Sequence, residues 1–144
     1  MSEAVFRAHY EQIWNNKDAS GIPRFIAPNY RGHDPSEPAV ISGVEGYKLH
    51  FKTITTAFPD LRLTIEGILG VDERVAARWL AEGTHTGDLG EFPPSGVRVR
   101  LKGMSIALIR NRQLVEEHSV SDTLGLLKQI GVIPDTVAVP PVLF

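Results

Sequence analysis

Three titratable residues lie close together near the end of the chain, in the stretch EEHSVSDTLGLLKQIG at residues 116–131. Glu116, His118 and Asp122 are two and four residues apart, so in a β-strand their side chains share one face. A carboxyl group enclosed by apolar walls has a raised pKa and becomes a usable base near neutral pH. With an imidazole beside it, such a group could remove a proton next to a carbonyl and stabilise the enolate oxygen.

The same residues also have a structural interpretation. Leu114 and Val120 share their face and favour an inward orientation, which would place all three groups in a cavity. Asp122, however, directly precedes an apolar helical stretch and is a good candidate for its N-cap. A capping carboxylate accepts backbone N–H bonds, which depresses its pKa and makes it a poor base. Ser121 could take the cap instead, so both interpretations stay open at this point.

The hydrophobic periodicity predicts the elements that would position these residues. Apolar residues recur at helical spacing in the first part of the chain and alternate with polar residues after residue 60. The predicted helices cover residues 2–18, 18–27, 43–58 and 123–131, and the predicted strands cover 61–71, 74–87, 97–110 and 114–122. Helices followed by a run of strands indicate an α+β fold, with N-terminal helices packed on a curved antiparallel sheet of four or more strands. A cone-shaped cavity is expected between the two layers.

Composition narrows the class of protein. A chain of 144 residues predicts one domain over 1–144, in which 132–144 form an apolar, proline-containing tail. The net charge of -2 and the lack of a basic block argue against nucleic acid as a partner. Without cysteine, thiol nucleophiles and zinc–thiolate sites are excluded. No apolar run reaches the ~20 residues that span a bilayer, and the N-terminus has no signal-peptide core, so we predict a cytoplasmic protein without a membrane partner.

Several stretches together resemble a known family. YEQIWNNKD, HDP, AFPDLRLTIEGILGVDERVAARWLAEGTHTG, FPPSG and LVEEHSVSDTLGLLKQIG are similar to the SnoaL-like polyketide cyclases, which belong to the nuclear transport factor 2-like superfamily. The resemblance extends over residues 4–131. It implies a cone-shaped α+β barrel, an enzyme that needs no cofactor, and frequently a homo-oligomer such as a dimer. Characterised members close a ring by intramolecular aldol condensation in the biosynthesis of secondary metabolites.

The resemblance also implies site residues. Asp122 matches the aspartate that serves as general acid/base in the family, and Tyr10 matches a tyrosine that lines the pocket in some members. We therefore predict Asp122 as the catalytic acid/base and His118 as its assistant. Predicted substrate-binding residues are Tyr10, Trp14, His33, Phe51, Arg78, Trp79, His85, Met104 and Glu116. The five histidines show no H-x-x-x-H or H-x-H spacing, so no metal site is predicted.

The predicted function is acid/base catalysis on an apolar, carbonyl-bearing small molecule, by aldol cyclisation or isomerisation. Two alternatives remain. The first is a non-catalytic module of the same fold that binds a small molecule. The second is epoxide opening by a carboxylate-activated water, for which Arg78 and Asp122 could supply two of the groups.

Overall fold

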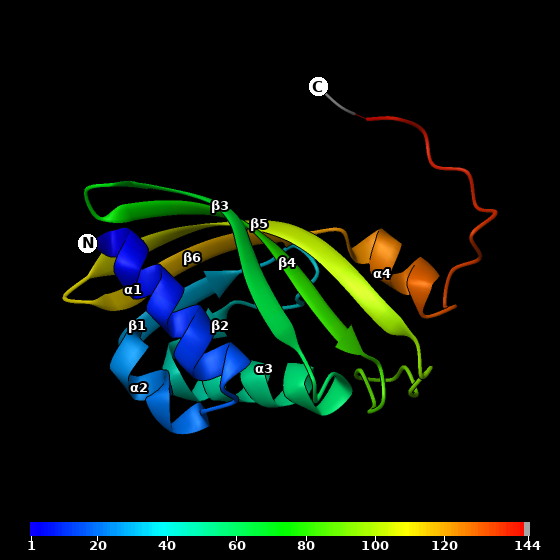
Figure 1. The fold of residues 1–144 in the computed structure, drawn as a ribbon, viewed down its shortest axis with the longest axis horizontal. Coiled ribbons are helices and arrows are strands. Elements are labelled where there is room, and N and C mark those ends of the chain that lie inside the picture. The colour runs from blue at the N-terminus through cyan, green and yellow to red at the C-terminus, as the bar shows by residue number, and fades with distance from the viewer. Residues whose placement is uncertain (143–144) are drawn as a thin grey trace.

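A computed structural model describes residues 1–142 of the chain (Figure 1). Helices and two strands occupy residues 2–57, four long strands follow, and a short helix comes after them. The elements are α1 (Ser2–His9), the π-helix η1 (Tyr10–Asn15), the 3₁₀ turn η2 (Ala19–Gly21), α2 (Ile22–Phe25), β1 (Ile26–His33), β2 (Ile41–Ser42), α3 (Gly43–Ala57), β3 (Arg62–Val71), β4 (Arg74–Thr84), β5 (Arg98–Arg110), β6 (Gln113–Ser121) and α4 (Thr123–Gln129).

One sheet organises the molecule, with strand order β2-β1-β6-β5-β4-β3. Strands β3 to β6 form the predicted antiparallel meander. The sequence pattern did not show that β1 pairs in parallel with β6, nor that β2 then pairs with β1 at the edge. The α+β class and the curved sheet are confirmed. The sheet has six strands because β1 and β2, which precede the meander in the chain, join it.

Helices α1, α2 and α3 all lie against one face of the sheet (Figure 1). The predicted apolar stripe of the first helix is buried, with Phe6 and Ile13 fully enclosed. After His9 this helix continues as a π-helix, whose wider turn appears in the bonds from Asn16 N–H to Glu11 C=O and from Asp18 N–H to Ile13 C=O. Tyr10 and Trp14 lie in that segment, and their buried side chains line the space between the helices and the sheet.

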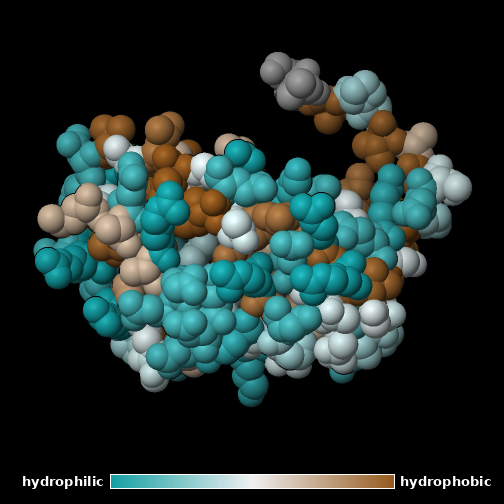
Figure 2. All heavy atoms as spheres, viewed as in Figure 1, coloured by the Kyte–Doolittle hydropathy of each residue, from teal (hydrophilic) through white to brown (hydrophobic). Residues whose placement is uncertain are grey.

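The opposite face of the sheet carries apolar side chains on its surface. Leu69 on β3 is 73% exposed and Ile106 on β5 is 56% exposed. In Figure 2 brown spheres gather along the upper side of the molecule, over the strands and away from α1 and α3. The register places Leu69 beside Ala76, Ala76 beside Ile106, and Ile106 beside His118 across four strands. We call Leu69, Ala76 and Ile106 the outer apolar row, which ends beside His118.

The tail after α4 extends away from the sheet and the helices (Figure 1). Val137 and Val139 are exposed, so this segment does not cover the mouth of its own barrel. Within residues 1–142, no helix combines the length and the apolar character needed to cross a membrane.

Candidate active site

A cavity of about 390 Å³ lies between the helices and the concave face of the sheet. Its walls are mainly aromatic and aliphatic, with a few polar groups that face inward. The aromatic walls come from Tyr10, Trp14, Tyr30, Tyr47, Phe58 and Trp79. This is the cavity that the layered α+β fold predicts, and it is large enough for a small organic molecule.

Three carboxylates, Asp34, Glu37 and Glu117, line this cavity, and Glu117 is the buried one. It lies in the middle of β6, its side chain faces the helices, and the residue is only 8% exposed. The Tyr30 hydroxyl, on neighbouring β1, donates a hydrogen bond of 2.9 Å to Oε1 of Glu117. Burial raises the pKa of the Glu117 carboxyl above its ordinary value, and the hydrogen bond from Tyr30 opposes that rise. Glu117 is therefore a desolvated carboxyl group held in place by a phenol.

Hydroxyl groups continue this polar region along the cavity wall. The Trp79 indole N–H donates to Ser105 Oγ at 3.0 Å, and Ser105 Oγ lies 2.7 Å from Ser119 Oγ on β6. Gly103, which pairs with Trp79 across β4 and β5, leaves the space for the indole ring, because a Cβ there would overlap it. The cavity floor thus combines a fixed aromatic ring with two hydroxyl groups.

The tyrosines opposite the carboxylate remain protonated. Burial raises the pKa of Tyr10, Tyr30 and Tyr47 above the ordinary value, and the nearby Glu117 carboxylate raises it further. The Tyr47 hydroxyl accepts a hydrogen bond of 2.8 Å from the Trp14 indole N–H. Tyr47 therefore keeps its own proton to donate to a ligand oxygen.

A β-bulge explains why Glu117, and not Glu116, faces inward. Ile109 pairs with Leu114 and Leu108 pairs with Glu116, so Val115 has no partner on β5. Leu114 points into the core as predicted, but the extra residue shifts the alternation by one. Glu117 and Ser119 therefore line the cavity, while Glu116 and His118 face outward. The predicted inward orientation of Glu116 and His118 is wrong for this reason.

Asp122 caps the last helix. Its Oδ1 accepts a hydrogen bond of 2.9 Å from the Gly125 N–H, and the residue is exposed and does not line the cavity. A Cβ at residue 125 would meet the Asp122 carboxylate in its capping position, so glycine leaves room for this conformation of the cap. The D-x-x-G part of the C-terminal motif therefore has a structural role. The predicted placement of Asp122 in the cavity is wrong, and its catalytic role stays a prediction that the placement does not favour.

Asp122→Ala should lower the free energy of unfolding by about 1 kcal/mol, because the Gly125 N–H loses its acceptor. Urea unfolding followed by circular dichroism measures this change. Asp88→Ala is a suitable control, since Asp88 is exposed and should change stability by less than about 0.5 kcal/mol. Equal effects of the two substitutions would contradict the capping role.

The other predicted substrate-binding residues separate into three groups. Tyr10, Trp14 and Trp79 line the cavity, and His33 lies at its rim; contact with a substrate stays a prediction for all four. Phe51 packs against the Trp14 ring at 5.1 Å, and His85 is buried and hydrogen-bonds Ser95. Arg78, which pairs with Glu66 at 3.0 Å, and Met104 lie on the outer face because β4 and β5 alternate as strands do.

Sequence reasoning missed Glu117, Tyr30, Tyr47 and Ser105 as cavity residues. The adjacent acids Glu116 and Glu117 were a sign that either could face inward, because a bulge of one residue exchanges the faces of the two side chains. Tyr47 is a buried residue of α3, and helical periodicity indicates burial of the ring without indicating a role for its hydroxyl. Tyr30 lies in a segment whose pairing with β6 could not be seen from local periodicity.

Comparison with known proteins supports the same fold and family. Residues 4–130 match the family described as SnoaL-like polyketide cyclase. A structure described as a candidate polyketide cyclase from Acidithiobacillus ferrooxidans is 27% identical, with a TM-score of 0.80 over 90% of this chain and 93% of that one. AclR from Streptomyces galilaeus, described as a candidate hydroxylase, is 27% identical, with a TM-score of 0.80 over 94% and 84%.

IdmH from Streptomyces antibioticus, described as a candidate polyketide cyclase, is 25% identical to this chain. Its TM-score is 0.77, over 91% of this chain and 99% of that one. No curated protein sequence matches the chain.

Proposed function

Because the chain belongs to the SnoaL-like polyketide cyclase family, we propose that it is an acid/base enzyme acting on an apolar, carbonyl-bearing small molecule. The observation that carries this proposal is the buried Glu117 carboxyl at the cavity wall, bonded to Tyr30 and surrounded by aromatic rings. Its raised pKa brings it closer to the range in which a carboxylate accepts a proton from carbon effectively. Side chains of the cavity supply both the base and the hydrogen-bond donors, so the reaction needs no cofactor.

In the proposed reaction, the Glu117 carboxylate removes a proton from the carbon next to a substrate carbonyl. The resulting enolate oxygen accepts a hydrogen bond from the Tyr47 hydroxyl, whose position is fixed by Trp14. In ring closure, the enolate carbon attacks a second carbonyl of the same molecule, and the new alkoxide takes the proton back from Glu117. In an isomerisation, Glu117 returns the proton to a different carbon.

The first step can be tested without knowing the natural substrate. Small apolar ketones such as 2-tetralone would be incubated with the protein in D₂O, and loss of the α-proton signals would be followed by NMR. Exchange above the buffer rate supports a positioned base. Binding of the ketone, seen as protein shift changes at the cavity residues, without any faster exchange across a panel of ketones would contradict catalysis and favour the alternative of a binding module.

Epoxide opening fits the cavity less well. The predicted arginine for that chemistry, Arg78, is on the outer face and pairs with Glu66. Among the described residues that line the cavity, none is an arginine. The cavity therefore favours proton transfer at carbon over activation of a water molecule by an Asp–Arg group.

We further propose that the outer face of the sheet binds a second copy of the chain. An antiparallel sheet exposed to water normally presents polar side chains on that face, whereas this face presents the outer apolar row together with Met104 and Val120. The apolar row crosses three adjacent strands, and Met104 pairs with Val120 on the fourth, so the apolar surface is continuous and could pair with itself about a two-fold axis. A cytoplasmic location and a role in secondary metabolism stay predictions from the sequence.

Ile106→Glu should convert this dimer into a monomer, because the new carboxylates would be buried without partners. Sedimentation velocity at micromolar protein concentration distinguishes the two states. Leu49→Glu is the matched control, since Leu49 is 67% exposed on α3, on the other side of the molecule. A wild-type protein that sediments as a monomer would exclude the proposed dimer.

A further inference from the structure

Two histidines and a glutamate come together on the outer face of the sheet. His33 ends β1, and Glu116 and His118 lie on β6, two residues apart after the bulge. The parallel pairing of β1 with β6 places His33 directly beside His118 and Arg31 beside Glu116. Neighbouring positions of paired strands project to the same face. This arrangement depends on a pairing between residues more than 80 positions apart, so no local His spacing could indicate it.

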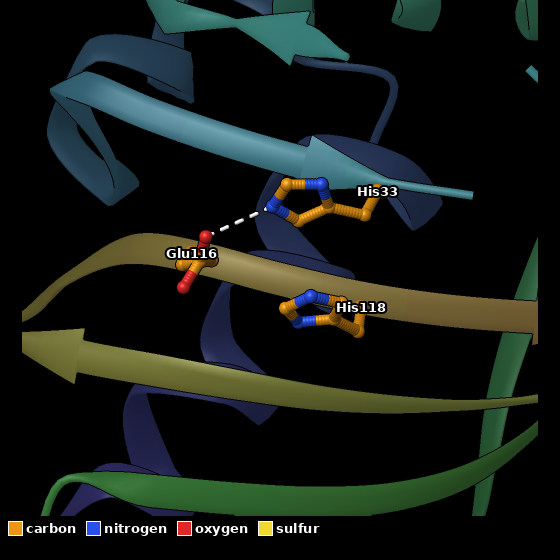
Figure 3. A group of neighbouring side chains, drawn as sticks. All are labelled: His33, Glu116 and His118. Carbon is orange, nitrogen blue, oxygen red and sulfur yellow. Dashed lines mark hydrogen bonds and ion pairs between the residues drawn. The ribbon is translucent and has the colours of Figure 1, made fainter. Parts of the chain in front are cut away.

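The three side chains are close enough to act on one ligand. His33 Nε2 lies 2.9 Å from Glu116 Oε2, and the rings of His33 and His118 stack with centroids 4.3 Å apart and planes 15° from parallel. One donor atom from each residue lies within 4.8 Å of the other two. Figure 3 shows the two rings side by side, with the Glu116 carboxylate next to them.

We propose that His33, Glu116 and His118 bind a divalent first-row transition metal ion such as Zn²⁺ or Co²⁺. Imidazole suits these ions, and two imidazoles with one carboxylate form a common three-ligand set. Ligands at ~2.1 Å in a tetrahedral site lie about 3.4 Å from one another. Donor atoms that are up to 4.8 Å apart therefore need to approach by as much as about 1.4 Å, while His33 Nε2 and Glu116 Oε2, at 2.9 Å, need to separate slightly. Rotation of partly exposed side chains provides this movement, because His33 and Glu116 retain 27% and 41% of their side-chain exposure.

An ion pair between His33 and Glu116 accounts for two of the three residues. It gives no role to His118, whose ring lies against the ring of His33 and whose nitrogen completes the donor set. The cluster is also at the end of the outer apolar row and at the edge of a hollow of about 900 Å³. With three protein ligands, a bound ion would keep one or more positions open toward that hollow.

This site is separate from the proposed function. Glu117 faces the cavity on the concave side, while His118 lines the hollow on the outer side and Glu116 lies beside His33. None of the proposed metal ligands is a proposed catalytic residue, although His33 also lies at the rim of the cavity. Loss of metal binding and loss of proton-transfer activity can therefore be measured independently.

Isothermal titration of untagged protein with ZnCl₂ tests the proposal, and the expected stoichiometry is one ion per chain. Titration with CoCl₂ should give visible d–d absorption from an ordered site. His118→Gln should weaken binding at least about 100-fold, because it removes a direct ligand and loss of a supporting contact alone costs 10–100-fold. The matched control is His50→Gln, which removes a His–Glu pair of 3.6 Å with Glu37 that has no third donor within residues 1–142.

Imidazole ¹⁵N NMR of the wild-type protein adds a measurement that does not depend on a variant folding. Addition of Zn²⁺ should shift the nitrogens of His33 and His118 and leave those of His9, His50 and His85 in place. The proposal is overturned by the absence of binding in the titration, by equal affinity of wild type and a folded His118→Gln variant, or by shifts confined to other histidines.

Discussion

Glu117→Gln is expected to lower the rate of α-proton exchange by about 10²–10⁴-fold, the usual contribution of a positioned acid/base group. Glutamine has nearly the same shape and keeps an oxygen that can accept the hydrogen bond from Tyr30. The cavity should therefore retain its form while losing the group that accepts the proton. Exchange of the 2-tetralone α-protons, followed by NMR in D₂O, measures the effect.

Two further variants make this result specific. Glu82→Gln changes a glutamate that pairs with Arg100 on β5 and lies outside the cavity, so exchange should continue at the wild-type rate. Asp122→Asn tests the original assignment from the family resemblance. If Asp122→Asn abolishes exchange while Glu117→Gln leaves it unchanged, Glu117 is not the base.

The same substitution should stabilise the protein at neutral and alkaline pH. Because the pKa of Glu117 is raised in the folded state, folding favours its protonated form, and that stabilisation is lost as pH rises through the folded-state pKa. Glutamine carries no charge that must be buried, so Glu117→Gln should raise the free energy of unfolding by about 0.5–2 kcal/mol at pH 8, the range usual for stabilising substitutions. Below the unfolded-state pKa the two unfolding curves should converge. A loss of stability at pH 8 would show that the carboxylate is stabilised by its partners.

The elements of the fold could be predicted because local patterns determine them. The stripe of Phe6, Tyr10 and Trp14 and the alternation of β3 indicate a helix and a strand without reference to the rest of the chain. The pairing of β1 with β6 could not be predicted in this way, because it joins residues such as His33 and His118 that are distant in sequence. Both the cluster of His33, Glu116 and His118 and the hydrogen bond from Tyr30 to Glu117 depend on this pairing.

The predicted orientation of the residues on β6 was wrong because of one extra residue in the strand. Strict alternation from Leu114 leads to Glu116 and His118, but the unpaired Val115 moves Glu117 to the inner face. No turn residue or glycine marks this bulge in the sequence. For Asp122, by contrast, the sequence did contain the correct signal, because its position before the helix predicts an N-cap. The family resemblance nevertheless favoured a catalytic role. Local capping chemistry was the better guide to its position.

His9 should make the protein sensitive to acid. It is fully buried against the rings of Phe6 and Tyr10, and its Nδ1–H donates to the Phe6 carbonyl at 2.5 Å. Among the described residues, none offers a hydrogen-bond partner to Nε2. Burial lowers the pKa of His9 from 6.5 to about 4, because the charged ring would lack both water and an acceptor at Nε2.

The direction of the effect follows from proton linkage. Between pH 6.5 and about 4 the unfolded chain binds a proton at His9 that the folded chain does not, so stability falls as pH falls. At 1.36 kcal/mol per pKa unit, this depression corresponds to a loss of about 3 kcal/mol between pH 7 and pH 4. Glu117 acts in the opposite direction over the acidic range, because its protonated form is favoured by folding.

Comparison of wild type with His9→Leu isolates the histidine from the other titrating groups. Leucine is an apolar side chain of similar size for this site, so the variant should fold, and its urea unfolding would be measured at half-unit steps from pH 4 to pH 8. Relative to His9→Leu, wild type should lose about 3 kcal/mol toward pH 4. Parallel stability curves would mean that His9 becomes protonated within the fold, which would require water or another acceptor to reach Nε2 beside Tyr10. In that case the first helix would open at the wall of the cavity, and Tyr10 could not be a fixed part of it.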